Sequence, residues 1–283
     1  MTGKLASMRD AVGALVRDGD RVSAACGLEA RIPFAAGHEI IRQRKRDLTL
    51  LGPISDMLYD QLIGAGCVRA IEAAWVGNVG AGLGHNFRRA LESDPPSVSM
   101  TDYTNLTYAT GLRAAAEGVP FATTRALFGT DLATQSHAFR EIDDPFTGKR
   151  VFAVRAIPVD VAIVVAQRAD EGGNAHVWGN LGTTAESARA AERVLLVVEE
   201  LVSAEVIRSD PNRTLIPGFL VDAVVVEPGA AHPSPVDGYE ERDHGAFEEY
   251  HRATRTVEGW QAWRREWIDG VVDRRAYLAK LRA

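Results

Sequence analysis

Residues 201–250, LVSAEVIRSDPNRTLIPGFLVDAVVVEPGAAHPSPVDGYEERDHGAFEEY, carry the pattern that decides the fold of this chain. The segment begins with charged turn residues, and the pair Pro217-Gly218 then interrupts it. Residues 219–226 follow as an apolar run typical of a buried strand, and residues 229–235 predict a rigid tail. Nothing in the segment has the pattern of an independent catalytic centre, so its meaning depends on the rest of the chain.

Upstream of this segment, strand and helix patterns alternate every ten to fifteen residues. Short apolar runs predict strands, and apolar residues three and four positions apart predict helices. Such alternation is typical of βαβ units, whose parallel sheet is covered by helices on both faces. The predicted strands are residues 21–26, 48–51, 68–76 and 98–101, and the predicted helices are residues 5–16, 34–44, 57–65, 87–91 and 105–117.

The pattern loosens after Phe121, and residues 143–149 have the composition of a polar hairpin turn. Residues 159–165, VDVAIVV, then form the most apolar strand pattern of the chain. A helix is predicted at residues 185–191 and a further strand at residues 194–198. We therefore expect an α/β fold with an open, mostly parallel sheet and helices on both faces.

The C-terminal forty residues predict amphipathic helices. Trp260, Trp263 and Trp267 have the i, i+3, i+7 spacing of a stripe that packs in a core or at a subunit interface. We expect one domain over residues 1–283, with a helical C-terminal extension over residues 240–283.

Composition excludes several classes of function. The chain of 283 residues is 46% hydrophobic and carries a formal charge of −6, which argues against nucleic-acid binding. Its two cysteines cannot form a disulfide framework, and its seven histidines never fall at metal-ligand spacing. The sequence has no signal-peptide pattern and no run of about 18 apolar residues. We expect a soluble cytoplasmic protein with neither a bound metal nor membrane contact.

The first candidate site is the turn Cys26–Pro33, which follows one predicted strand and precedes a helix. In an open α/β sheet, ligands bind at the carboxyl ends of strands, where glycine permits close approach and helix amides attract anions. Gly27 is predicted to permit this approach, and Arg31 to contact an anion or phosphate. An ordinary turn with a surface arginine explains the same residues.

The second candidate is the glycine-rich loop GNVGAGLG at residues 77–84. It superficially resembles a dinucleotide fingerprint, with Asp102 at the end of the next strand as a ribose-binding acid. The spacing argues against this reading, because G-x-G-x-x-G from Gly80 requires a glycine at the position of His85. Asn78, Gly80 and Gly82 are predicted to line an acyl or pantetheine chain, and a plain turn is the alternative.

The third candidate is the pair Asp170 and Glu171, which follows the most apolar strand. Adjacent residues of an extended chain point to opposite faces, so the two carboxylates are poorly placed for joint acid–base work. The composition Asp-Glu-Gly-Gly-Asn at residues 170–174 is also typical of a turn. We therefore interpret this segment as structural.

Taken in order, these segments resemble the alpha subunits of family I coenzyme A transferases of the glutaconate type. Two segments are specific: DVAIVVAQRADEGGNAHVWG at residues 160–179 and SDPNRTLIPGFLVDAVV at residues 209–225. The resemblance covers nearly the whole chain. The other resembling segments are the turn with Arg31 and Pro33 and residues 46–50, 84–90 and 118–121.

The resemblance implies an open α/β sheet shared with ribose-5-phosphate isomerases and a covalent transfer of coenzyme A. In the family, the beta subunit carries a glutamate in a Glu-Asn-Gly-like motif that attacks an acyl-CoA, and a carboxylic acid later accepts the CoA. This chain has no such tripeptide. It is therefore expected to join a beta subunit in an α2β2 heterotetramer, with acyl-CoA as substrate and no tightly bound cofactor.

The resemblance also implies how this chain contributes to the site. Arg31 and the glycine loops would form a wall of the acyl pocket, with backbone amides from residues near Gly27 and from residues 77–82. Asp102 or Asn105 would contact the acyl group, Asp102 as the candidate catalytic residue.

Two alternatives stay open. The alpha subunit of a steroid ring-cleaving hydrolase has a similar fold and carries an acid near the segment matching residues 102–105, where this chain reads DYTN. That resemblance implies hydrolytic opening of an alicyclic acyl-CoA. The third possibility is a non-catalytic ligand-binding protein that has kept the fold and lost the chemistry.

Overall fold

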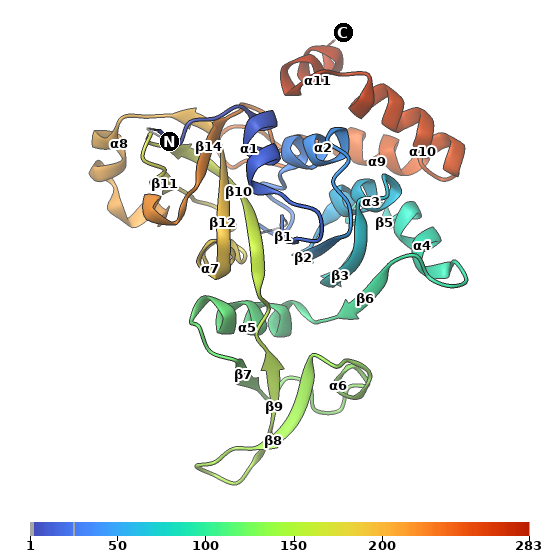
Figure 1. Cartoon of the computed structure of the whole chain (residues 1–283), viewed down its shortest axis with the longest axis vertical. Helices are drawn as coiled ribbons and strands as arrows, with labels where there is room; N and C mark the ends of the chain where they lie inside the picture. Colours follow the sequence, from blue (N-terminus) through green and yellow to red (C-terminus); the bar gives the residue numbers. More distant parts are fainter. Residues whose placement is uncertain (1–2, 25, 283) are drawn as a thin grey trace.

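The computed structural model describes residues 3–24 and 26–282 and is built around one nine-stranded, mostly parallel sheet (Figure 1). The main strand order is β13-β11-β10-β1-β2-β3-β6, and β12 pairs with β10 and β14. The parallel strands are β1 (Arg21–Ser23), β2 (Leu48–Ile54), β3 (Val68–Trp75), β6 (Ser99–Asp102), β10 (Val159–Ala169), β12 (Ala191–Leu201) and β14 (Ala223–Val226). The short strands β11 (Ala175–His176) and β13 (Thr214–Ile216) are antiparallel.

Helices cover both faces of this sheet, as the sequence predicts. On β10, Val161, Ile163 and Val165 belong to one hydrophobic cluster, and the alternate residues 162, 164 and 166 belong to a second. Alternation along a strand sends neighbouring side chains to opposite faces, so each cluster is the core of one layer. The first layer contains α1 (Met8–Leu15), α2 (Phe34–Arg42), α3 (Asp56–Gly64) and α4 (His85–Glu92), and the second contains α5 (Asn105–Ala116) and α7 (Thr184–Ala190).

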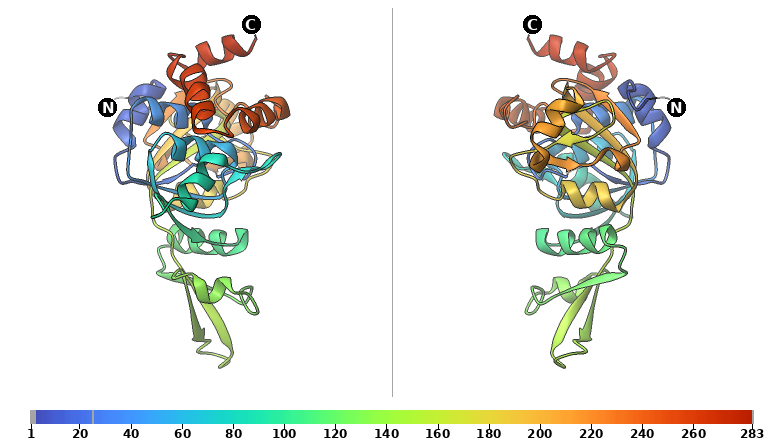
Figure 2. Two further views of the ribbon diagram at one scale, coloured as in Figure 1. Left: turned by 90° about the vertical axis from the view of Figure 1, so that its right-hand side faces the viewer. Right: turned by 90° about the vertical axis from the view of Figure 1, so that its left-hand side faces the viewer.

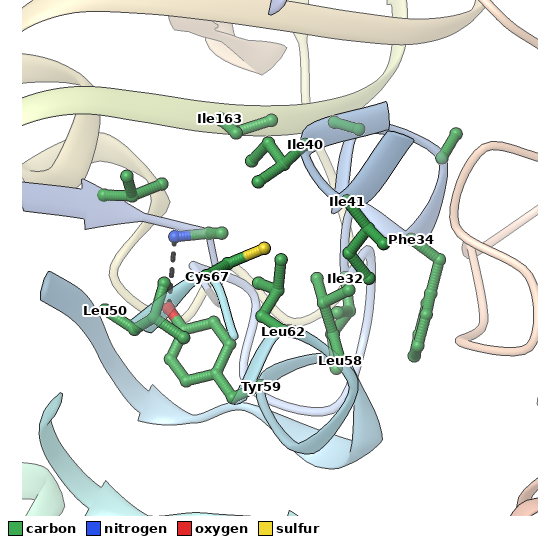
Figure 3. Close-up of a cluster of buried hydrophobic side chains, with 14 of the residues drawn as sticks. Ile32, Phe34, Ile40, Ile41, Leu50, Leu58, Tyr59, Leu62, Cys67 and Ile163 are labelled. Atoms are coloured by element: carbon green, nitrogen blue, oxygen red, sulfur yellow. Dashed lines mark hydrogen bonds between the residues drawn. The ribbon is translucent and has the colours of Figure 1, made fainter. Parts of the chain in front are cut away.

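Figure 3 shows part of the first layer, where Ile163 faces α2 and α3. The hydroxyl of Tyr59 lies within this apolar cluster and makes two hydrogen bonds. It accepts from the N–H of Ala24 at 3.3 Å and donates to the carbonyl of Leu51 at 2.5 Å. A buried hydroxyl needs such partners, and these two bonds connect the residue after β1 to the middle of β2.

A small antiparallel sheet projects from the main body, as both views of Figure 2 show. It contains β7 (Phe121–Thr124), β8 (Phe139–Asp143) and β9 (Arg150–Arg155) in the order β7-β9-β8, with the short helix α6 (Leu132–Gln135) beside it. The predicted turn at residues 143–149 is confirmed as the β8–β9 connection. The projecting sheet as a unit was not predicted, because its strands are shorter and more exposed than β2 and β10 of the main sheet.

The C-terminal extension is helical, as predicted, and contains α9 (His244–Ala253), α10 (Val257–Arg264), a π-helical turn (Arg265–Asp269) and α11 (Arg274–Leu281). Trp260 and Trp263 are buried and stacked at 6.0 Å between ring centroids. The tryptophan stripe therefore belongs to the core. No helix in the described part of the chain is long and apolar enough to span a membrane.

The predicted strand at residues 219–226 is wrong over its first half. Gly218–Leu220 forms a 3-10 turn in which Phe219 is 85% exposed, and β14 begins only at Ala223. The cause is a polar contact that the apolar pattern hides: Gly218 N–H donates to Asn174 Oδ1 at 2.8 Å. The predicted strand at residues 21–26 ends at Ser23, and Ala25 lies outside the described residues. The remaining elements are α8 (Ala204–Ser209) and the hairpin strands β4 (Gly77–Asn78) and β5 (Gly82–Leu83).

Replacing Ile163 by alanine tests the core assignment. Ile163 is fully buried, so the loss of its side chain removes apolar contacts and leaves a cavity. We expect the free energy of unfolding in urea to fall by about 2–5 kcal/mol. The matched control is Val272→Ala at a position that is 84% exposed, where the change stays within about 0.5 kcal/mol. Equal effects of the two substitutions would contradict the assignment.

Candidate functional site

The loops after the parallel strands meet at one edge of the sheet, because parallel strands end at the same side. The loops after β1, β3 and β10 contain residues 24–33, 76–84 and 170–183, which include the candidate glycines. Hydrogen bonds join the loops after β1 and β10 to each other, and the loops after β1 and β3 are each bonded to the C-terminal segment.

Arg31 holds three loops together from a buried position. Its side chain is 1% exposed, and Nη1 donates to the carbonyl of Trp178 at 3.1 Å, while Nη2 donates to the carbonyl of Asn180. Nη1 also lies 3.7 Å from a carboxylate oxygen of Asp237. Burial lowers the pKa of Arg31, and the Asp237 charge opposes this effect. The guanidinium faces protein oxygens rather than solvent, so its contact with a substrate anion stays a prediction.

Gly27 lies where two of these loops are in close contact. A side chain at Gly27 would meet the carbonyl of Ala30, and one at Gly182 would meet the carbonyl of Cys26. The N–H of Thr183 donates to that same Cys26 carbonyl at 2.7 Å. Glycine is therefore required at Gly182 by the packing of one loop on the other and at Gly27 by the tightness of its own turn, and approach of a substrate to Gly27 stays a prediction.

The glycine-rich loop is a hairpin with a buried base and an exposed tip. Asn78 is 1% exposed, and its Nδ2 donates to the carbonyl of Phe247 at 2.6 Å. Its Oδ1 accepts from the N–H of Gly80 at 3.2 Å. Gly80 and Gly82 are exposed, and Gly82 has a φ of +108°, which favours glycine.

The expectation that this loop donates its amides to a substrate meets a physical obstacle. The N–H groups of Val79, Gly80 and Ala81 already donate to protein oxygens. The exposed surface of the loop tip is largely apolar, because Val79 is 39% exposed and Leu83 is 45% exposed. The tip is therefore better suited to contact a flexible apolar chain than to bind an oxyanion.

Asp56 is the site residue that the sequence analysis missed. It is fully buried as the first residue of α3, two positions after the end of β2, and its φ of +47° is unusual for a residue other than glycine. Its Oδ1 accepts from the N–H of Val79 at 3.2 Å, and its Oδ2 pairs with Arg242 at 2.7 Å. Burial raises the pKa of Asp56, and the Arg242 charge opposes this effect. The signal in the sequence is an acid two positions after a buried strand.

Asp102 and Asn105 lie at the end of β6 and the start of α5, and both are exposed. Asp102 lines a small hollow of about 70 Å³ together with His137. Leu106, next to Asn105, lines a separate cleft of about 440 Å³ with Gly182 and other residues of the loop after β10. The structure thus brings the start of α5 close to the Gly27–Gly182 contact, and leaves Asp102 on the edge strand.

The third candidate is a turn, as interpreted from the sequence. The carboxylate of Asp170 accepts from the backbone N–H of Asn174 at 2.9 Å and from its side-chain amide at 3.0 Å. Glu171 is exposed. In the residues that the structure describes, no three His, Cys, Asp or Glu side chains are arranged to hold a metal ion.

Glu199 fixes the rigid tail predicted at residues 229–235. Its Oε2 accepts from the N–H of Gly229 at 2.7 Å, and Arg274 Nε donates to the carbonyl of the same glycine at 2.7 Å. Burial raises the pKa of Glu199 to about 7, and the neighbouring Glu240 charge adds to the rise. The folded protein thus favours the protonated form of Glu199.

This raised pKa predicts a pH dependence of stability. The unfolded chain releases the proton of Glu199 near its ordinary pKa of about 4.3, whereas the folded chain holds it until about pH 7. The stabilisation is therefore complete below about pH 4.3 and is lost as the pH rises to about 7. Between pH 5 and pH 8, wild type should lose stability relative to Glu199→Gln in urea unfolding. If the difference in free energy of unfolding between wild type and the variant stayed constant over this pH range, the raised pKa of Glu199 would be contradicted.

Replacing Asp56 by asparagine should destabilise the loop network. The substitution leaves the guanidinium of Arg242, which is 13% exposed, without its carboxylate. Breaking a buried ion pair in this way costs about 3–5 kcal/mol. Urea unfolding measures the loss, and Asp18→Asn is the control because the Asp18–Arg46 pair is exposed. A loss below about 1 kcal/mol would show that the pair does not hold the loops.

Comparison with known proteins adds to this geometry. The family model described as Coenzyme A transferase matches residues 5–227. The chain is 39% identical to the alpha subunit of the 3-oxoadipate CoA-transferase of Pseudomonas knackmussii, over 98% of each chain. It is 34% identical to the alpha subunit of the glutaconate CoA-transferase of Acidaminococcus fermentans, over 99% of this chain and 92% of that protein.

Structural comparison agrees with these matches. The crystal structure of the Acidaminococcus fermentans glutaconate coenzyme A-transferase superposes with a TM-score of 0.92 at 33% identity, covering 98% of this chain and 92% of that chain. A more distant relative is the cholesterol ring-cleaving hydrolase IpdA subunit of Mycobacterium tuberculosis, which is 29% identical over 57% of this chain and 58% of that protein. The chain therefore belongs to the coenzyme A transferase family, among the alpha subunits of its two-subunit members.

Proposed function

We propose that this chain provides one wall of an active site whose nucleophile lies on a partner beta subunit, and that the assembly transfers CoA from an acyl-CoA to a carboxylic acid. The observation that carries the proposal is a full-length match to alpha subunits of CoA-transferases in a sequence without a Glu-Asn-Gly tripeptide. An α2β2 stoichiometry and a cytoplasmic location are part of the proposal.

The proposed reaction divides between the two chains. A glutamate carboxylate of the partner attacks the acyl-CoA thioester carbon, which gives a mixed anhydride and releases the CoA thiolate. The thiolate then attacks the glutamyl carbonyl, which forms a glutamyl-CoA thioester and releases the first carboxylate. The second carboxylic acid repeats these steps in reverse and leaves as its CoA thioester, and the glutamate is restored.

In this division, the present chain positions substrate and limits the access of water. The exposed apolar tip at Val79 and Leu83 suits the methyl and methylene groups of the pantetheine arm, and the loop is held at its base by Asn78 and Asp56. The cleft beside Leu106 and Gly182 is the proposed place for the acyl group. Arg31 acts in this proposal as a positioning residue that keeps the loop after β10 in place.

Trapping the covalent intermediate tests the proposal. The complex is purified gently from native cells and incubated with an acyl-CoA in the absence of an acceptor acid. Intact mass spectrometry then measures the mass of each chain. We expect a stoichiometric partner chain to gain the mass of CoA less one water, while the present chain stays unchanged. Incubation with free CoA is the control and should label neither chain. A label on the present chain, or a homo-oligomer with no partner, would refute the proposal.

A ring-opening hydrolase is the second candidate, favoured by the similarity to the ring-cleaving subunit and by an acid, Asp102, near the corresponding segment. The two functions make opposite predictions for Asp102→Asn. Asp102 is exposed at the end of an edge strand, so the fold should tolerate the change. Asp102 does not line the cleft proposed for the acyl group, so for a transferase we no longer assign it a catalytic role and expect CoA transfer within about twofold of wild type. For a hydrolase, loss of a catalytic base lowers the rate by about 10²–10⁴-fold. Thr101→Ser, at the neighbouring position, is the control.

A further inference from the structure

A cavity of about 620 Å³ opens among the helices of the first layer, and it shares no lining residue with the site proposed above. Its walls come from distant parts of the sequence: the first turns of α1 and α11, the side of α2, and the end of β14. These elements neighbour one another in the upper half of Figure 1. Arg9, Arg42, Arg274 and Arg275 contribute four guanidinium groups to the lining.

Two of the three acidic residues of this cavity accept hydrogen bonds from the protein. Glu39 accepts from Arg42 Nε and from Gln43 Nε2, each at 2.8 Å, so both of its carboxylate oxygens have a partner. The carboxylate of Asp273 caps the first turn of α11. Glu39 and Asp273 therefore both accept hydrogen bonds from the protein, and the lining holds four arginines against three carboxylates, the third being Glu227.

Within the described part of the chain, three of the arginines form no close ion pair, although the charges of Glu240, Glu227 and Glu199 act on Arg274 from a longer distance. Among the residues that the structure describes, Arg9, Arg274 and Arg275 form no ion pair within 4.0 Å. Arg274 is 3% exposed, and its Nε and Nη2 donate to the carbonyls of Gly229 and His232. Its Nη1 is buried without a hydrogen-bond partner. A buried cationic donor without an acceptor is costly, so an anion that binds beside it would be stabilised.

The helix termini add to this positive field. Residues of the first turns of both α1 and α11 line the cavity, and each of these helices has eight residues. The first N–H groups of a helix lack intrahelical acceptors and carry partial positive charge, which attracts anions. The side chains of Ser7 and Asp273 already accept from the N–H groups of Asp10 and Ala276, so the other first-turn N–H groups and the three arginines remain as donors. Together they exceed what one carboxylate can accept, whereas a phosphate accepts from several directions.

We propose that this cavity binds a small phosphate-bearing anion between the N-terminal turns of α1 and α11. The volume exceeds that of a bare phosphate, so the ligand is an organic phosphate or diphosphate with its anionic group at the arginines. The inference does not depend on the transfer reaction, because its readout is binding rather than turnover.

The test uses pyrophosphate as probe and isothermal titration calorimetry at constant ionic strength. The full-length protein is titrated as purified, with any partner retained. We expect saturable binding that weakens at least tenfold in the Arg9→Gln/Arg275→Gln variant, which changes two exposed side chains and so spares the fold. Arg252→Gln is the matched control, because Arg252 is an exposed helical arginine outside the cavity. The affinity of this variant for pyrophosphate should stay within twofold of wild type.

Two outcomes would overturn the proposal. The first is the absence of saturable binding to the wild-type protein. The second is equal weakening by the double variant and by Arg252→Gln, which would indicate attraction to the general surface charge. The midpoint of thermal unfolding should be the same for wild type and the variants. A loss of affinity is then due to the change in the cavity and not to a disturbed fold.

Discussion

One buried carboxylate links the segments on which the proposed site depends. Asp56 binds the glycine-rich loop through the N–H of Val79 and the C-terminal segment through Arg242, and it is fully buried while doing so. A buried charge is stable only when its partners are complete, so each segment requires the others in place. Asn78 reinforces this arrangement from the opposite direction by donating to the carbonyl of Phe247. The C-terminal extension is thus part of the support of the site.

In the proposed function, the parallel sheet explains how a chain without the nucleophile contributes loops to a shared active site. Parallel strands place their following loops at one edge, and here buried polar side chains hold those loops. The amides of the glycine-rich loop are used inside the protein, and its exposed atoms are largely apolar. Such a surface can position a substrate and exclude water, whereas covalent chemistry requires a nucleophile from elsewhere. A two-chain enzyme is consistent with both features.

Much of the fold could be predicted from the sequence because its core strands are strongly apolar. The alternation of strands and helices up to residue 117 matches the structure to within a few residues, and so does the strand that contains Ile163. The errors lie where polar contacts between distant residues decide the conformation. Phe219 reads as part of a strand, but the contact between Gly218 and Asn174 produces an exposed turn.

The candidate site was less predictable for the same reason. The order of predicted strands and helices correctly indicated which loops follow parallel strands. It therefore also indicated which residues lie at the same edge of the sheet. It could not indicate that Arg31 faces inward or that Asp56 is paired with Arg242, since both depend on partners more than 140 residues away. A side chain's direction and its distant partner are properties of packing, which no local pattern encodes.

Hydrogen exchange of the loop at residues 76–84, measured with and without the partner chain, tests the central claim most directly. The claim is that this loop and the start of α5 face a second chain across the active site. Partner binding should slow exchange in peptides covering residues 76–84 and 104–107, while peptides of α11 keep their rate. Unchanged exchange in those two segments, with protection only elsewhere, would contradict the claim.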